Sequence, residues 1–147
     1  MLTAVAMAML LLGGCGGGSV EGGNAYVKTT DRVVKAFETE FQALQASFTP
    51  VSTPRQDLRT LATLRGSVDR AVTALTQITP PATIAPLHAR LVRQIQEYRA
   101  VIAGAERGFA SGDPRRILAA RSRFSTALAA VATKISATIS AINEQLR

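Results

Sequence analysis

Apolar residues recur at intervals of three and four positions through four long segments of the chain. A helix has 3.6 residues per turn, so positions with this spacing fall on one face and predict an amphipathic helix. The predicted helices cover about residues 26–48, 54–78, 84–110 and 114–145. No segment shows the strict alternation that is typical of a strand, so the pattern predicts an all-α fold.

Turn-forming residues separate these segments. Thr-Pro at 53–54 has the order of an N-cap and a first helical residue. Thr-Pro-Pro at 79–81 ends the second segment, because the residue before a proline avoids the helical region. Ser-Gly-Asp-Pro at 111–114 suits a helix end followed by a new N-cap. Short links force antiparallel neighbours, so we expect an up-down-up-down four-helix bundle over residues 25–147.

The first residues of the chain follow a different pattern. Residues 1–12 carry no charged side chain and run into Leu-Leu-Gly-Gly-Cys at 11–15. A membrane-spanning helix needs about 20 apolar residues, so this shorter run favours the apolar core of a signal peptide. The stretch Leu12-Gly13-Gly14-Cys15 resembles the lipobox of bacterial lipoprotein precursors.

The resemblance implies that Cys15 receives a diacylglyceryl group and that the chain is cut just before it. Residues 1–14 would then be a cleaved signal peptide, and the Gly-rich residues 15–24 the lipidated cysteine and a flexible tether. Two or three acyl chains, palmitate among them, anchor a protein stably. We therefore expect a protein anchored in the cell membrane or outer membrane and facing outside the cytoplasm. The remaining chain is similar, in general terms only, to small helical lipoproteins of unassigned function.

The chain is basic, with 17 Lys and Arg against 10 Asp and Glu. Export from the cytoplasm, and the lack of basic runs interleaved with aromatic residues, argue against nucleic acid as a partner. One basic group follows the tether and is a candidate contact for anionic lipid: Lys28, Arg32 and Lys35. A second group begins the last predicted helix, at the far end of the bundle, and is a candidate contact for an acidic protein or envelope polymer: Arg115, Arg116 and Arg123.

Few residues suggest catalytic or metal chemistry. Cys15 is the only cysteine, so an intramolecular disulfide is excluded. His88 is the only histidine, has no acid three or four residues away, and sits beside an apolar stripe near the proline turn. Metal sites need several converging ligands, so we expect packing at the core boundary for His88 and no metal or cofactor. The acidic residues are expected to lie off the apolar stripes, whereas Arg121 falls on one and must pair or reach solvent.

These observations predict a lipid-anchored extracytoplasmic binding or adaptor protein of the bacterial envelope, and not an enzyme. Two alternatives remain open. The first is a carrier with a small-ligand cavity inside the bundle, and the second is an enzyme whose site depends on side chains that converge only in the fold.

Overall fold

The computed structural model describes residues 19–49 and 51–147. This part of the chain forms four helices: α1 (Ser19–Gln45), α2 (Pro54–Thr76), α3 (Ala85–Phe109) and α4 (Pro114–Gln145). A single 3-10 turn, η1 (Ala82–Ile84), precedes α3. The described residues contain no strand, and the prediction of an all-α helical bundle is confirmed.

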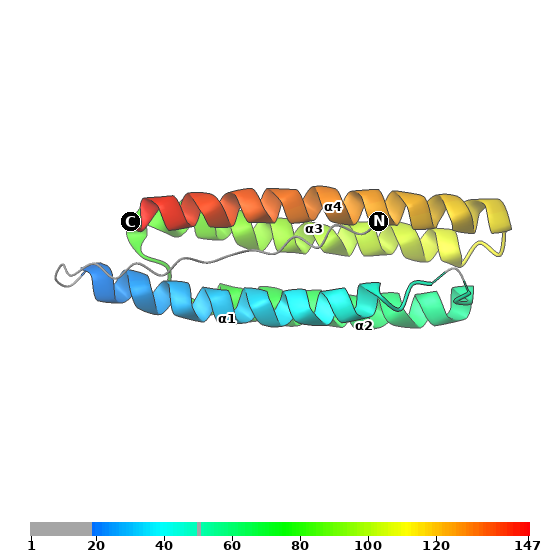
Figure 1. Ribbon diagram of the computed structural model, residues 1–147, viewed down its shortest axis with the longest axis horizontal. Coiled ribbons are helices and arrows are strands. Elements are labelled where there is room, and N and C mark those ends of the chain that lie inside the picture. Colours follow the sequence, from blue (N-terminus) through cyan, green and yellow to red (C-terminus); the bar gives the residue numbers. More distant parts are fainter. Residues whose placement is uncertain (1–18, 50) are drawn as a thin grey trace.

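The helices lie lengthwise in one elongated bundle (Figure 1). The α1–α2 and α3–α4 links lie at one end, which we call the link end. The start of α1, the α2–α3 link and the C-terminus lie at the opposite end, which we call the terminal end. Helices that follow one another in the chain pack together: α1 on α2, α2 on α3, and α3 on α4.

Local capping explains where two of the helices begin. Thr53 accepts a hydrogen bond from the Gln56 backbone N–H, and Gln56 Oε1 accepts one from the Thr53 N–H at 2.8 Å, which is a capping box at the start of α2. Asp113 accepts a hydrogen bond from the Arg115 N–H at 2.8 Å at the start of α4. Gly112 has a φ of 70°, a conformation that glycine adopts without strain.

The start of α1 corrects one expectation. Residues 19–24 were predicted to belong to the flexible tether, but α1 begins at Ser19 and includes them. Gly23 is buried, and a Cβ placed there would lie 3.5 Å from Leu146 Cδ2. The start of α1 therefore lies close to the end of α4, near Leu146. The lipobox residues Leu12, Gly13, Gly14 and Cys15 lie outside the described residues.

The core is a continuous column of apolar side chains from all four helices. The rings of Phe37, Phe41 and Tyr98 join α1 to α3, with centroids 5.0 to 5.8 Å apart. Phe48 lies beyond the end of α1, yet its ring packs on Phe109 and Phe124. Among the helices described, α4 alone is long and apolar enough to cross a membrane, a property that core helices share.

Candidate functional site

A groove of about 690 Å³ lies between α3 and α4 in the half of the bundle nearer the link end. Small side chains form much of its lining, and we call it the α3/α4 groove. Four arginines border it, Arg107 from α3 and three from α4. The remaining lining residues are Ala100, Val101, Gly104, Ala105, Gly108, Ser111, Ala119, Ala120, Phe124 and Ala127.

Close packing of α3 on α4 explains the small residues. A Cβ built on Gly108 would lie 2.3 Å from the Cβ of Ala120 and 3.7 Å from the carbonyl oxygen of Arg116. Real Cβ atoms do not approach one another so closely, so the two backbones meet at a point where only glycine fits. The side chains that line the groove near this point are therefore short, and the longer arginine side chains lie at its border.

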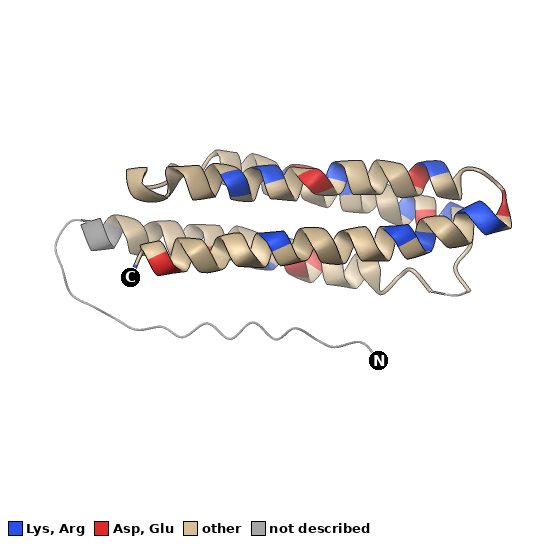
Figure 2. Ribbon diagram, turned by 90° about the horizontal axis from the view of Figure 1, so that it is seen from above, with Lys and Arg blue, Asp and Glu red and all other residues tan. Residues whose placement is uncertain are grey.

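The positive charge of the groove is largely uncompensated. Within the described residues, Arg107, Arg115 and Arg123 form no ion pair, and Arg116 Nε lies 3.8 Å from Asp113 Oδ2. Such an exposed pair is worth less than about 1 kcal/mol. Figure 2 shows the basic residues of α4 gathered towards the link end.

Four acids on α1, α2 and α3 are paired with other cations. Asp69 accepts from Arg99 at 2.7 Å, and Lys134 donates to Glu97 at 2.7 Å. Glu40 pairs with Arg70, and Glu106 pairs with Arg65. These pairs join consecutive helices along the bundle. They leave the arginines of the groove as a separate basic surface.

The structure brings the three predicted contact residues Arg115, Arg116 and Arg123 to one groove. It adds Arg107, which the sequence did not single out. A signal was present, because the short link at 110–113 must place the last turn of α3 beside the first turn of α4. Basic residues on both sides of this link could therefore have been grouped.

The other predicted basic group lies on α1, towards the terminal end. Lys28 and Arg32 are exposed and form no ion pair within the part of the chain that the structure describes. Lys35 Nζ lies 2.9 Å from Asp31 Oδ2, one helical turn away. Two of the three side chains are thus available to an anionic surface.

One acid contradicts the expectation that all acids lie off the apolar stripes. The Asp57 side chain is fully buried, and Arg121 Nη2 donates to its Oδ2 at 2.6 Å. Ser52 Oγ lies 2.7 Å from the other oxygen, Oδ1. The signal was in the sequence, since Asp57 precedes Leu61 and Leu64 by four and seven positions and so lies in phase with their stripe. Arg121 pairs, which is one of its two expected outcomes.

His88 is buried where α1, α2 and α3 meet. Its Nε2 lies 3.1 Å from the Leu75 carbonyl oxygen and its Nδ1 lies 3.0 Å from the Tyr26 hydroxyl. A carbonyl can only accept, so Nε2 carries the hydrogen, and the Tyr26 hydroxyl donates to Nδ1. Burial lowers the pKa of His88, opposed by the hydrogen bond to Leu75. The neutral ring thus ties three helices together.

The described residues contain no group of three or more His, Cys, Asp or Glu side chains that could hold a metal ion.

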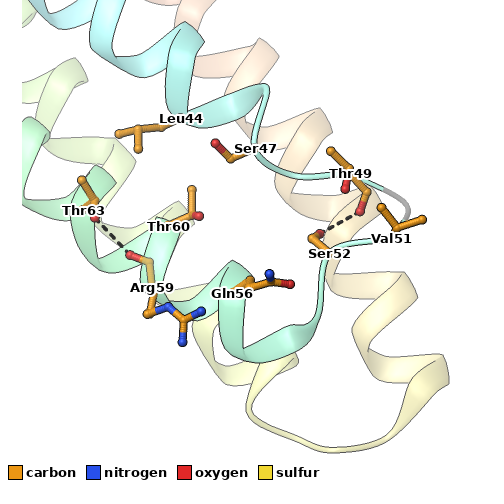
Figure 3. Close-up of a pocket in the computed structure, with 9 residues that line it drawn as sticks. All are labelled: Leu44, Ser47, Thr49, Val51, Ser52, Gln56, Arg59, Thr60 and Thr63. Carbon is orange, nitrogen blue, oxygen red and sulfur yellow. Dashed lines mark hydrogen bonds between the residues drawn. The ribbon is translucent and has the colours of Figure 1, made fainter.

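A second hollow, of about 440 Å³, lies beside the α1–α2 link (Figure 3). Hydroxyl side chains predominate in its lining, which consists of Leu44, Ser47, Thr49, Val51, Ser52, Gln56, Arg59, Thr60 and Thr63. Two of these hydroxyls already have partners within the fold: Ser52 Oγ lies 2.7 Å from both the Thr49 carbonyl oxygen and Asp57 Oδ1 and can donate its one hydrogen to either, and Thr63 Oγ1 donates to the Arg59 carbonyl at 3.2 Å. The hollow offers one cation, Arg59, whereas the α3/α4 groove has four.

Comparison with known proteins finds no family model, no curated protein and no solved structure that matches this chain.

Proposed function

We propose that this protein is a lipid-anchored adaptor of the bacterial envelope that binds an acidic partner in the α3/α4 groove. The observation that carries the proposal is the groove itself, in which four arginines surround a lining of small residues. Of these four arginines, only Arg116 lies within ion-pair distance of an acid in the described part of the chain. Guanidinium groups bind carboxylates through two parallel hydrogen bonds, which gives both affinity and orientation.

The proposed anchor is Cys15, supported by the sequence Leu12-Gly13-Gly14-Cys15. We further propose that the helices run up-down-up-down, supported by the packing of consecutive helices and the positions of their links. The terminal end would then face the cell membrane or outer membrane, outside the cytoplasm. Lys28 and Arg32 could add roughly 1 kcal/mol each on an anionic lipid surface.

This orientation would hold the groove away from the bilayer. The 23 residues of α2 span about 35 Å at 1.5 Å per residue. Surface charges are screened beyond about 8–10 Å at physiological salt. The arginines of the groove would therefore act on a partner and not on the anchoring membrane.

A binding role is favoured over a catalytic one because the buried groups Asp57 and His88 use their hydrogen-bonding atoms within the fold. Asp57 and His88 are each hydrogen bonded within the fold, through Arg121 and Ser52 in one case and Tyr26 and Leu75 in the other. These contacts hold the helices together. The groove instead offers exposed charge, which speeds association and sets specificity in protein complexes.

Fractionation and mass spectrometry test the anchor. We expect wild-type protein in the membrane fraction with an acylated N-terminal Cys15, and Cys15→Ala either released or unprocessed. The variant Ser19→Ala is the matched control and should behave as wild type. An unmodified Cys15 thiol in the mature wild-type protein would contradict the anchor.

Photo-crosslinking in intact cells tests the groove. A crosslinkable residue at Ala119 should capture a partner, and the product should be lost when Arg115→Gln and Arg123→Gln are added. The pair Lys28→Gln and Arg32→Gln carries the same charge change at the other end of the bundle and should leave the product unchanged. Equal loss in both pairs would show that overall charge, and not the groove, is responsible.

A further inference from the structure

Two glycines in α3 differ in what the fold requires of them. Gly108 has no room for a side chain, because its Cβ would lie 2.3 Å from Ala120. Gly104, one turn earlier, is exposed, and its Cβ would meet only Arg107 Nη2, at an ordinary contact distance of 3.9 Å. Glycine inside a helix is less favourable than alanine. Packing explains Gly108 and does not explain Gly104.

Gly104 lies in the lining of the α3/α4 groove, together with Ala100, Ala119 and Ala127. An exposed glycine lets another backbone approach closely, because no Cβ keeps it away. The side of α3 that faces the groove therefore offers open backbone at this position. Arg107 and the arginines of α4 stand nearby.

We propose that the α3/α4 groove accepts an acidic amphipathic helix of a partner protein, with Gly104 at the point of closest backbone approach. This inference rests on the proposed function and adds the conformation of the partner and a residue that determines specificity. The apolar face of the incoming helix would lie on the alanines and on Val101. Carboxylates along the two edges of that apolar face would pair with Arg107 on one side and the α4 arginines on the other.

The chemistry of the groove favours a helix over an extended segment. The described residues are helical or lie in links, so they offer no sheet edge to which a strand could add. An extended segment lying on alanines would leave its own backbone groups without partners, whereas a helix satisfies them internally. Small residues also allow two helix axes to approach to about 8 Å. A flexible polyanion would use the arginines and would gain nothing from an open Gly104.

The test uses the full-length lipidated protein in nanodiscs and three fluorescent probes. The first probe is a synthetic amphipathic peptide of Ala, Leu and Glu with Glu residues along both edges of its apolar face. The second has the same composition with alternating D-residues, which prevent a helix. The third is inorganic polyphosphate. Wild-type protein should bind the helical peptide at least about tenfold more tightly than the second peptide, a difference of about 1.4 kcal/mol.

Gly104→Leu should weaken binding of the helical peptide at least about tenfold and leave polyphosphate binding unchanged. Gly22→Leu is the matched control, because Gly22 is also an exposed helical glycine, has nothing within 4 Å of its Cβ position, and lies at the other end of the bundle. It should bind all three probes as wild type does. Helical content measured by circular dichroism checks that both variants fold.

The outcomes separate this inference from the function on which it rests. Equal binding of the helical peptide by wild type and Gly104→Leu would overturn the helix and retain the acidic partner. Binding of polyphosphate but neither peptide, lost in Arg115→Gln with Arg123→Gln, would replace the helix by an anionic polymer. Probe binding unchanged by that arginine pair would overturn the proposed function itself.

Discussion

Arg121 of α4 donates a hydrogen bond from Nη2 to Oδ2 of Asp57 in α2 at 2.6 Å, and the Asp57 side chain is completely buried. The same guanidinium donates to the backbone carbonyls of Thr49 and Ser52 at 3.3 and 2.8 Å. One side chain from α4 therefore holds both the start of α2 and the α1–α2 link. Burying a charge is costly unless it is paired and hydrogen bonded. The buried Asp57 carboxylate has both Arg121 and Ser52 beside it, and the Arg121 side chain remains 27% exposed.

Removing one partner of this pair should be strongly destabilising. Arg121→Met leaves the Asp57 carboxylate buried without its cation, so we expect the free energy of unfolding to fall by about 3–5 kcal/mol. Chemical denaturation followed by circular dichroism measures the change. Arg123→Met is the control, because Arg123 is exposed and unpaired within the described residues, and should change stability by less than about 0.5 kcal/mol. Similar losses in both variants would contradict the structural role of the pair.

Stability should depend on pH through His88. Burial lowers the pKa of the folded His88 below its ordinary value of 6.5, so the unfolded chain binds this proton more readily than the folded chain. The contribution of neutral His88 is therefore complete above about pH 6.5 and is lost as the pH falls below that value towards the folded pKa. Wild type should lose more stability than His88→Gln between pH 7 and 5 when unfolding is measured across that range. Parallel pH profiles for the two proteins would show that another group is responsible.

The hydroxyl of Tyr26 should stabilise the hydrogen-bonded contact that His88 makes between α1, α2 and α3. Tyr26→Phe removes the donor to His88 Nδ1 and leaves a buried acceptor unsatisfied, at a cost of about 1–3 kcal/mol. The measurement is thermal unfolding at pH 7.5, where His88 is neutral. Tyr98→Phe is a useful comparison, because the ring of Tyr98 is buried but its hydroxyl makes no hydrogen bond to His88. A cost for Tyr26→Phe no greater than that for Tyr98→Phe would be evidence against the assigned bond.

Replacing Gly108 and Gly104 of α3 by alanine, one at a time, should change the free energy of unfolding in opposite directions. Gly108→Ala forces α3 and α4 apart and should cost about 1–3 kcal/mol. Gly104→Ala meets no clash and should gain up to about 1 kcal/mol from helix propensity. Thermal unfolding of both variants measures the difference. Adding Ala120→Gly to Gly108→Ala should restore part of the loss, and failure of this rescue would place the clash elsewhere.

Charge reversal should separate the two basic ends. Arg115→Glu with Arg116→Glu changes only exposed positions and should alter stability by less than about 1 kcal/mol. In liposome flotation with lipidated protein and anionic vesicles, this pair should leave binding unchanged, whereas Lys28→Glu with Arg32→Glu should reduce it. The opposite pattern would mean that the link end, and not the terminal end, faces the membrane.

Much of the fold follows from short stretches of sequence. The apolar period and the capping residues Thr53 and Asp113 act between neighbours in the chain, so they determine helices without reference to the rest of the protein. The start of α1 is the exception. The glycines of residues 19–24 predicted a flexible tether, whereas in the structure these residues are helical and Gly23 lies near Leu146. The proximity of Gly23 to Leu146 is tertiary, and the local sequence pattern does not contain it.

The sequence alone also determined that three basic residues of α4 would lie near one another and that Arg121 would fall on an apolar stripe, whereas Asp57 was wrongly expected to lie off the stripes. Only the tertiary structure decided that those two charges meet, and that Arg107 joins the α4 arginines around a groove. The physical reason is that periodicity places a side chain on a face of its own helix, whereas a site depends on which faces come together. Here the close approach of Gly108 to Ala120 sets the distance between α3 and α4, and this distance allows only small side chains at the base of the groove.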